Sequence, residues 1–116
     1  MTTTIYHNPK CATSRKVLAL IRLHGVEPEV VDYQKTPLSR DQLVALLGRL
    51  QARPRDILRL KGTPYAELGL DDPGLGDDRL IDAMVSHPIL LERPIVIADK
   101  GAALCRPPEK VLELLP

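Results

Sequence analysis

The order of elements in residues 3–34 constrains the fold most strongly. Residues 3–7 (TTIYH) are β-branched or aromatic and predict a strand. From Thr13 to Leu23 apolar residues recur with helical spacing, and Gly25 follows as a helix stop. Residues 29–34 (EVVDYQ) predict a second strand. A strand–helix–strand opening predicts a parallel strand pair joined by a right-handed crossover.

The rest of the chain predicts helices followed by a hairpin. Helices are expected over residues 36–50, with Ser39 as N-cap, over 53–62 and over 77–87, with a loop rich in Gly, Pro and Asp between the last two. Residues 94–99 and 102–106 predict a β-hairpin, and residues 107–116 a final helix. This α/β order, βαβ and then ββα, is typical of a thioredoxin-like fold with a helical insertion between the second strand and the C-terminal hairpin. We expect a single domain over residues 1–116.

Composition excludes several classes of function. Aromatic residues are only 3% of the chain and its net charge is +1, so neither a base-stacking surface nor a strongly basic field for nucleic acid is expected. No apolar run approaches the roughly 20 residues of a membrane span, and the N-terminus does not resemble a secretory signal. Two cysteines make no disulfide framework and lack zinc-site spacing. We therefore expect a cytoplasmic monomer without a metal site.

Cys11 stands after an Asn-Pro turn, where a helix is about to begin. A helix N-terminus carries unpaired N–H groups and partial positive charge, and His7, Lys10 and Arg15 are close in sequence. Each of these features favours a thiolate, so Cys11 is predicted to be a low-pKa nucleophile. The alternative is an ordinary small residue at a helix start.

The second position of a Cys-x-x-Cys motif is occupied by Ser14, which argues against a disulfide motif at Cys11. A monothiol can attack an electrophile, but a second thiol must then resolve the adduct. The second cysteine, Cys105, lies in the run AALCR, which predicts a strand, so burial is expected for it.

Three arginines are predicted to stand at ends of elements. Arg93 precedes Pro94 at the head of a strand, Arg106 ends the partner strand, and Arg59 ends the short helix. Guanidinium groups bind tetrahedral oxyanions in a bidentate way, so the three together predict an anion site, although most single arginines only cover surface or pair with Asp or Glu. Pro94 occupies the place where thioredoxin-like folds have a cis-proline against the active-site cysteine. His7 either stabilises the thiolate or has no chemical role.

The segments YHNPKCATSR, TPLSRDQL, TPYAELGL, DDRLIDAMVSHPILLERPIVI and LCRPPEKVLELLP occur in this order along nearly the whole chain. Together they resemble the glutaredoxin-coupled arsenate reductases. The resemblance implies a Cys11 nucleophile with His7 near the thiol, and a loop shaped by Ser14 and Arg15. It also implies that arsenate is held by Arg59, Arg93 and Arg106. Glutathione would be the co-substrate and glutaredoxin the partner, with no bound cofactor.

Two other functions stay open at this point. One is a glutathione-dependent oxidoreductase with a different substrate. The other is a redox-controlled transcription regulator that binds RNA polymerase, but the switch of that branch is a Cys-x-x-Cys motif, and Ser14 stands in the second position here.

Overall fold

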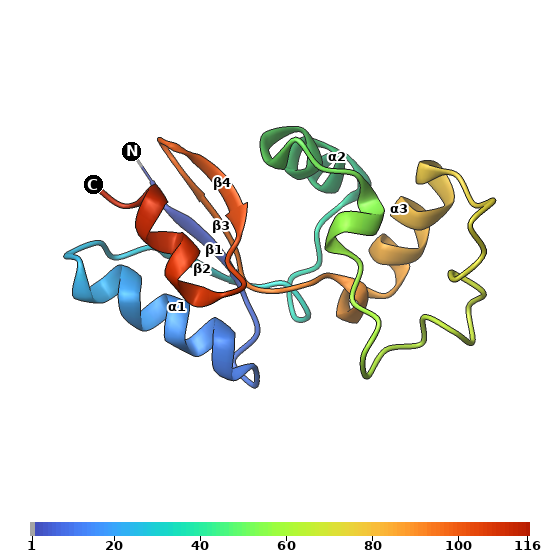
Figure 1. Cartoon of the computed structure of the whole chain (residues 1–116), viewed down its shortest axis with the longest axis horizontal. Helices are drawn as coiled ribbons and strands as arrows, with labels where there is room; N and C mark the ends of the chain where they lie inside the picture. Colours follow the sequence, from blue (N-terminus) through green and yellow to red (C-terminus); the bar gives the residue numbers. More distant parts are fainter. Residues whose placement is uncertain (1) are drawn as a thin grey trace. The chain divides into compact units, whose positions relative to one another are not determined.

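The computed structural model describes residues 2–116, which form two compact units. Unit 1 comprises residues 2–36 together with Arg93–Pro116, and unit 2 comprises Pro37–Glu92. Unit 1 holds all the strands, and unit 2 is the helical segment inserted between the second and third of them (Figure 1). The predicted position of the insertion is therefore confirmed. No helix among the described residues is both long and apolar enough to cross a membrane.

A four-stranded mixed sheet is the frame of unit 1. Its strands are β1 (Thr4–His7), β2 (Glu29–Asp32), β3 (Ile95–Ala98) and β4 (Gly101–Leu104), in the spatial order β2-β1-β3-β4. β1 runs parallel to β2, while β3 is antiparallel to both β1 and β4. The predicted parallel pair and hairpin are both confirmed.

The sequence predicted both β2 and β4 to extend two residues further than they do. β2 ends at Asp32 rather than Gln34, because the Asp32 side chain accepts a hydrogen bond from the Gln34 N–H and starts a turn. β4 ends at Leu104, so Cys105 and Arg106 follow the strand instead of belonging to it. The Cys105 N–H still donates to the Pro94 carbonyl at 2.9 Å, which keeps the two segments side by side.

Helix α1 (Ala12–Leu23) and the 3₁₀ helix η3 (Pro108–Leu114) pack against each other and against the sheet (Figure 1). Their apolar faces close a core that also includes the side chain of Cys105, and the predicted burial of this residue is confirmed. The buried members of this core are Ile5, Val17, Ile21, Val96, Ala98, Cys105, Val111, Leu114 and Leu115.

Unit 2 contains α2 (Arg40–Leu50), α3 (Asp77–Ser86) and two 3₁₀ helices, η1 (Pro54–Ile57) and η2 (Pro88–Leu90). Ser39 caps α2 as predicted, accepting a hydrogen bond from the Gln42 N–H while the Gln42 side chain accepts one from the Ser39 N–H. Leucines on one face of α2 are buried, as the helical spacing predicts: Leu43, Leu46 and Leu47.

The prediction that Arg59 ends a short helix is wrong. η1 ends at Ile57, and Leu58 instead forms an antiparallel bridge with Leu91. The Arg59 N–H donates to the Leu90 carbonyl at 2.7 Å, and the Glu92 N–H donates to the Ile57 carbonyl at 2.9 Å. These bonds satisfy the backbone in an extended form, so the helix does not continue.

Candidate active site

Cys11 is the N-cap residue of α1. A tight turn delivers it there, since the Cys11 N–H donates to the Asn8 carbonyl at 3.0 Å. The Asn8 side chain reinforces the turn by accepting from the Lys10 N–H at 2.9 Å. The predicted placement of this thiol at a helix N-terminus is confirmed.

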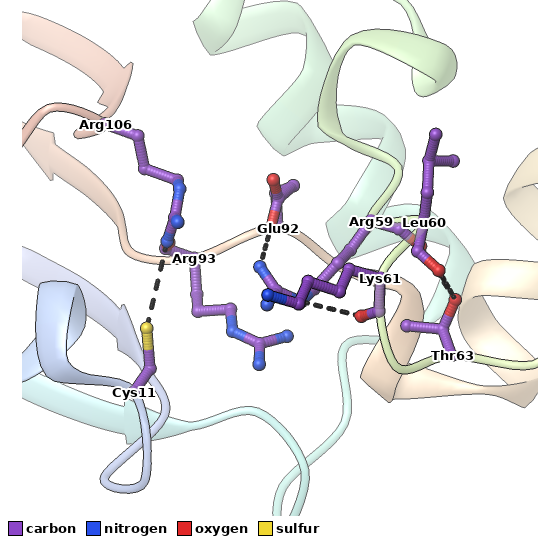
Figure 2. Close-up of polar contacts among 8 residues, drawn as sticks. All are labelled: Cys11, Arg59, Leu60, Lys61, Thr63, Glu92, Arg93 and Arg106. Atoms are coloured by element: carbon purple, nitrogen blue, oxygen red, sulfur yellow. Dashed lines mark hydrogen bonds and ion pairs between the residues drawn. The ribbon is translucent and has the colours of Figure 1, made fainter.

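Arg106 and Arg93 lie beside the thiol. The Nη1 atom of Arg106 is 3.8 Å from Cys11 Sγ and donates to the Arg93 carbonyl at 3.0 Å (Figure 2). The Arg93–Pro94 peptide bond is cis, the form that the sequence predicts, and the Arg106–Pro107 bond is cis as well. Because Pro94 and Cys105 are hydrogen-bonded neighbours, the two arginines stand at matching points of adjacent segments.

Arg93 has donors without acceptors. Its Nε and Nη1 atoms are buried and make no hydrogen bond within residues 2–116. A buried N–H group without a partner costs about 1–3 kcal/mol, and more when it is charged, so folded proteins rarely leave one unexplained. An oxyanion beside Cys11 would satisfy both donors.

The pKa of the Cys11 thiol lies below its ordinary value. Burial of the thiol works in the opposite direction and raises the pKa. The backbone N–H of Ser14 and the guanidinium groups of Arg93 and Arg106 outweigh burial, because all three favour the thiolate. The sequence predicted a contribution from the N–H groups of the helix N-terminus, and the Ser14 N–H confirms it. The sequence also named His7, Lys10 and Arg15 as causes, and that part of the prediction is wrong, because the charged groups that lower the pKa are Arg93 and Arg106.

Ser14 is fully buried and is the centre of a small polar network. Its Oγ atom lies 2.6 Å from Nδ1 of His7 and accepts a hydrogen bond from the Asn8 N–H at 3.1 Å. His7 and Asn8 are also buried, at 6% and 7% exposure. The network therefore ties the end of β1 to the first turn of α1, on either side of the Cys11 turn.

The pKa of His7 is lowered, chiefly by burial. The nearby Asp32 carboxylate raises it, while Arg22 and Arg15 lower it further. A neutral imidazole at neutral pH follows. Its hydrogen-bond partner is Ser14, so the geometry favours an indirect role for His7, in which it holds the residue whose N–H stabilises the thiolate.

Arg15 also braces the turn. Its Nη1 atom donates to the Pro9 carbonyl at 2.9 Å. The side chain is otherwise exposed. This contact agrees with the loop-shaping role that the family resemblance implies for Arg15.

Arg59 belongs to unit 2 and is already paired there. Its Nη1 atom lies 2.8 Å from a carboxylate oxygen of Glu92, and its Nε atom donates to the Lys61 carbonyl at 3.1 Å (Figure 2). Both side chains of the ion pair are largely buried, at 19% and 23% exposure. Arg59 makes these contacts within unit 2, whereas the arginines that lower the pKa of the Cys11 thiol, Arg93 and Arg106, belong to unit 1.

Sequence reasoning missed three residues of these surroundings. Asn8 builds the turn and joins the Ser14 network, and its only sequence signal is the Asn-Pro pair. Glu92 precedes Arg93 and neutralises Arg59. Tyr33 is fully buried; burial raises its pKa, while the charge of Arg93 lowers it. Among the described residues, no group of three or more His, Cys, Asp or Glu side chains is placed to hold a metal ion.

Comparison with known proteins finds matches over almost the whole chain. The model of the ArsC family matches residues 6–114. An arsenate reductase of Rhizobium meliloti (strain 1021) is 55% identical over 116 residues, which are 100% of this chain and 83% of the relative. An arsenate reductase of Escherichia coli (strain K12) is 52% identical over 113 residues, 97% of this chain and 80% of the relative.

A solved structure extends the similarity to three dimensions. The arsenate reductase from Vibrio cholerae superposes with a TM-score of 0.94 at 46% identity, covering 99% of this chain and 98% of that one. The α/β architecture is that of these reductases, and the predicted thioredoxin-like fold with its helical insertion is confirmed. A family model that matches almost the whole length, together with relatives that are more than 50% identical over the aligned residues, shows that this chain belongs to the ArsC family.

Proposed function

We propose that this protein reduces arsenate to arsenite, with the Cys11 thiolate as nucleophile. The observation that carries the proposal is the pair of buried, unpartnered donors of Arg93 beside a thiol whose pKa is lowered. A tetrahedral oxyanion fits such donors, because a guanidinium offers parallel N–H groups to two oxygens at once. The arsenate reductase names of the close relatives agree with this chemistry.

The first step forms a covalent adduct. Arsenate binds with its oxygens toward Arg93 and Arg106, whose charges offset that of the approaching anion. The Cys11 sulfur attacks arsenic, an S–As bond forms, and one arsenate oxygen leaves as water after taking up protons. Arsenic is still pentavalent in this adduct. Arg59 is proposed as a third group that binds the oxyanion.

The second step carries out the reduction. The sulfur of glutathione attacks the Cys11 sulfur, an S–S bond forms, and the S–As bond breaks with its electron pair remaining on arsenic. Arsenite leaves, and each of the two sulfurs, now joined in the mixed disulfide, has given up one electron to arsenic. A glutaredoxin thiol then attacks the glutathione sulfur and returns Cys11 as a thiolate. Glutathione is a co-substrate in this scheme, and no bound cofactor or metal takes part.

The proposal includes a setting for the enzyme. A reducing cytoplasm would keep Cys11 and Cys105 as thiols and would supply glutathione and glutaredoxin. One chain holds every group assigned a role, so a monomer is sufficient.

The test is arsenate-dependent oxidation of NADPH, coupled through glutaredoxin and glutathione reductase. Wild-type protein should turn over, Cys11→Ser should be inactive, and Cys105→Ala should retain most of the activity, because Cys105 lies in the core. Glutaredoxin-dependent reduction of a mixed disulfide on Cys11 without any response to arsenate would favour the oxidoreductase of another substrate.

A further inference from the structure

A pocket lies directly beside the Cys11 turn. It has a volume of about 280 Å³ and belongs entirely to unit 1. We call it the turn pocket, and it is lined by Asn8, Pro9, Lys10, Asp32, Gln34 and Lys35. One of the lining residues, Lys10, directly precedes Cys11 in the chain.

Strand register explains why the pocket exists. β1 and β2 are parallel, and their last residues, His7 and Asp32, are paired. The chain therefore leaves both strands at the same edge of the sheet, where open α/β sheets place their ligands. Both exits are held by side chains: Asn8 accepts from the Lys10 N–H, and Asp32 accepts from the N–H groups of Gln34 and Lys35 at 3.2 and 3.4 Å.

The charges in the turn pocket are two ammonium groups, of Lys10 and Lys35, and one carboxylate, of Asp32. We propose that this pocket binds glutathione and presents its thiol to Cys11. Glutathione has a carboxylate at each end and an ammonium group next to one of them, which is the opposite set of charges. The inference rests on the proposed function, in which glutathione is the thiol that attacks the Cys11 adduct.

The pocket suits glutathione better than the oxyanion. The Asp32 carboxylate repels a dianion, whereas the unpartnered donors of Arg93 attract one. In this proposal arsenate and glutathione have separate sites next to Cys11, so that the glutathione sulfur attacks the Cys11 sulfur while arsenite departs. Separate sites avoid a competition in which one substrate would exclude the other.

The test uses a reaction that needs no arsenate. Glutathione disulfide converts the Cys11 thiolate to the mixed disulfide and releases one glutathione thiolate. The rate is compared with that of bis(2-hydroxyethyl) disulfide, which has no charge. We expect Lys10→Gln and Lys35→Gln each to slow the reaction with glutathione disulfide by about twofold to fivefold, and the double variant by about tenfold, because exposed ion pairs contribute modestly. The rate with the uncharged disulfide should not change.

Lys16→Gln is the matched control. Lys16 is also a lysine close to Cys11 in sequence, but it lies on α1 outside the pocket and its partner is Glu109. This variant should react like the wild type with both disulfides. Equal slowing of both disulfides by the Lys10 and Lys35 variants, or no slowing of either, would overturn the inference.

Asp32 provides a second and independent measurement. Asp32→Asn retains an oxygen for the Gln34 and Lys35 N–H groups but removes the charge. It should slow the reaction with glutathione disulfide by about twofold to fivefold, and it should not affect a glutathione disulfide analogue that lacks the amino groups. Charge discrimination at Cys11 without arsenate-dependent NADPH oxidation would reject the proposed function and keep this inference. Arsenate reduction without charge discrimination would do the reverse.

Discussion

The Nδ1 atom of His7 lies 2.6 Å from the Oγ atom of Ser14, and both side chains are buried. Ser14 occupies the place that a second cysteine would take in a Cys-x-x-Cys motif. Here its hydroxyl also accepts from the Asn8 N–H, while its own N–H lowers the pKa of Cys11. The serine therefore supports a single thiol where a disulfide motif would have a resolving partner.

Replacement of Ser14 by alanine should destabilise the protein. The change leaves the His7 ring nitrogen and the Asn8 N–H without their partner in a buried place, at a cost of about 1–3 kcal/mol for such a group. The Ser14 N–H is unaffected, so Cys11 should still react as a low-pKa thiol. The measurements are the free energy of unfolding in urea and the pH dependence of Cys11 alkylation.

The neighbouring substitution Thr13→Ala is the control, since Thr13 is less buried and lies on the same turn of α1. It should change the free energy of unfolding much less. A loss of stability of the same size in both variants would mean that the buried hydrogen bonds of Ser14 are not the cause.

The lowered pKa of His7 should make stability depend on pH. In the unfolded chain the imidazole takes up a proton near its ordinary pKa of about 6.5, but the folded protein resists protonation to a lower pH. The unfolded state then binds more protons, so the free energy of unfolding should fall as pH decreases below about 6.5 and level off below the folded pKa. Urea unfolding between pH 7.5 and 5 measures this slope.

His7→Gln should reduce that slope, while His24→Gln, at an exposed position, should leave it as in the wild type. A slope that persists unchanged in His7→Gln would assign the proton uptake to another group.

Alkylation should distinguish the two thiols. Cys11 should react with an inflection below about 8.5, the value of a free thiol, and Arg106→Gln should raise that inflection by removing a charge near the sulfur. Cys105 should not react in the folded protein, because burial raises its pKa to about 12. Mass spectrometry should find one labelled cysteine without denaturant and two with it. Labelling of Cys105 in the folded protein at a rate comparable to that of Cys11 would contradict the burial of its thiol.

Local patterns were sufficient to predict much of the fold. The strand–helix–strand opening, the hairpin, the Ser39 cap and the burial of Cys105 all depend on residues close together in sequence. Helical spacing, capping residues and alternating apolar residues determine such features locally. Cys11 at the start of α1 was predictable for the same reason.

Contacts between distant residues were not predictable in this way. Arg106 is 95 residues from Cys11, and Arg59 is 33 residues from Glu92. Sequence proximity therefore suggested Lys10 and Arg15 as causes of the lowered thiol pKa, whereas the guanidinium groups of Arg93 and Arg106 contribute to it. The bridge between Leu58 and Leu91, which places Arg59 in an extended segment, likewise joins two separate parts of unit 2.

Lysine should not be able to take over the role of the arginines that we propose to bind arsenate. It keeps the charge but loses the planar set of donors, so Arg93→Lys and Arg106→Lys should each lower kcat/KM for arsenate by about tenfold to a hundredfold. Arg93→Lys should be the more damaging, because it removes the two unpartnered donors. Arg49→Lys, at an exposed position on α2, is the matched control and should be neutral. Wild-type kcat/KM in both site variants would reject the oxyanion site.

Glu92 should restrain Arg59. The carboxylate of Glu92 lies 2.8 Å from the guanidinium of Arg59 in a largely buried pair, so it competes with any anion that Arg59 would bind. Glu92→Gln removes the charge but keeps an oxygen that can accept a hydrogen bond. If Arg59 binds the oxyanion as proposed, this variant should lower the KM for arsenate by about threefold to tenfold while reducing stability by about 1–2 kcal/mol.

Asp78→Asn, which alters an exposed pair with Arg40 in the same unit, should change neither quantity. The two effects separate because stability depends on the pair itself, whereas KM depends on how much of the guanidinium remains available to the substrate. A KM that rises in Glu92→Gln would show instead that Glu92 positions Arg59 for arsenate, and an unchanged KM would remove Arg59 from the substrate site.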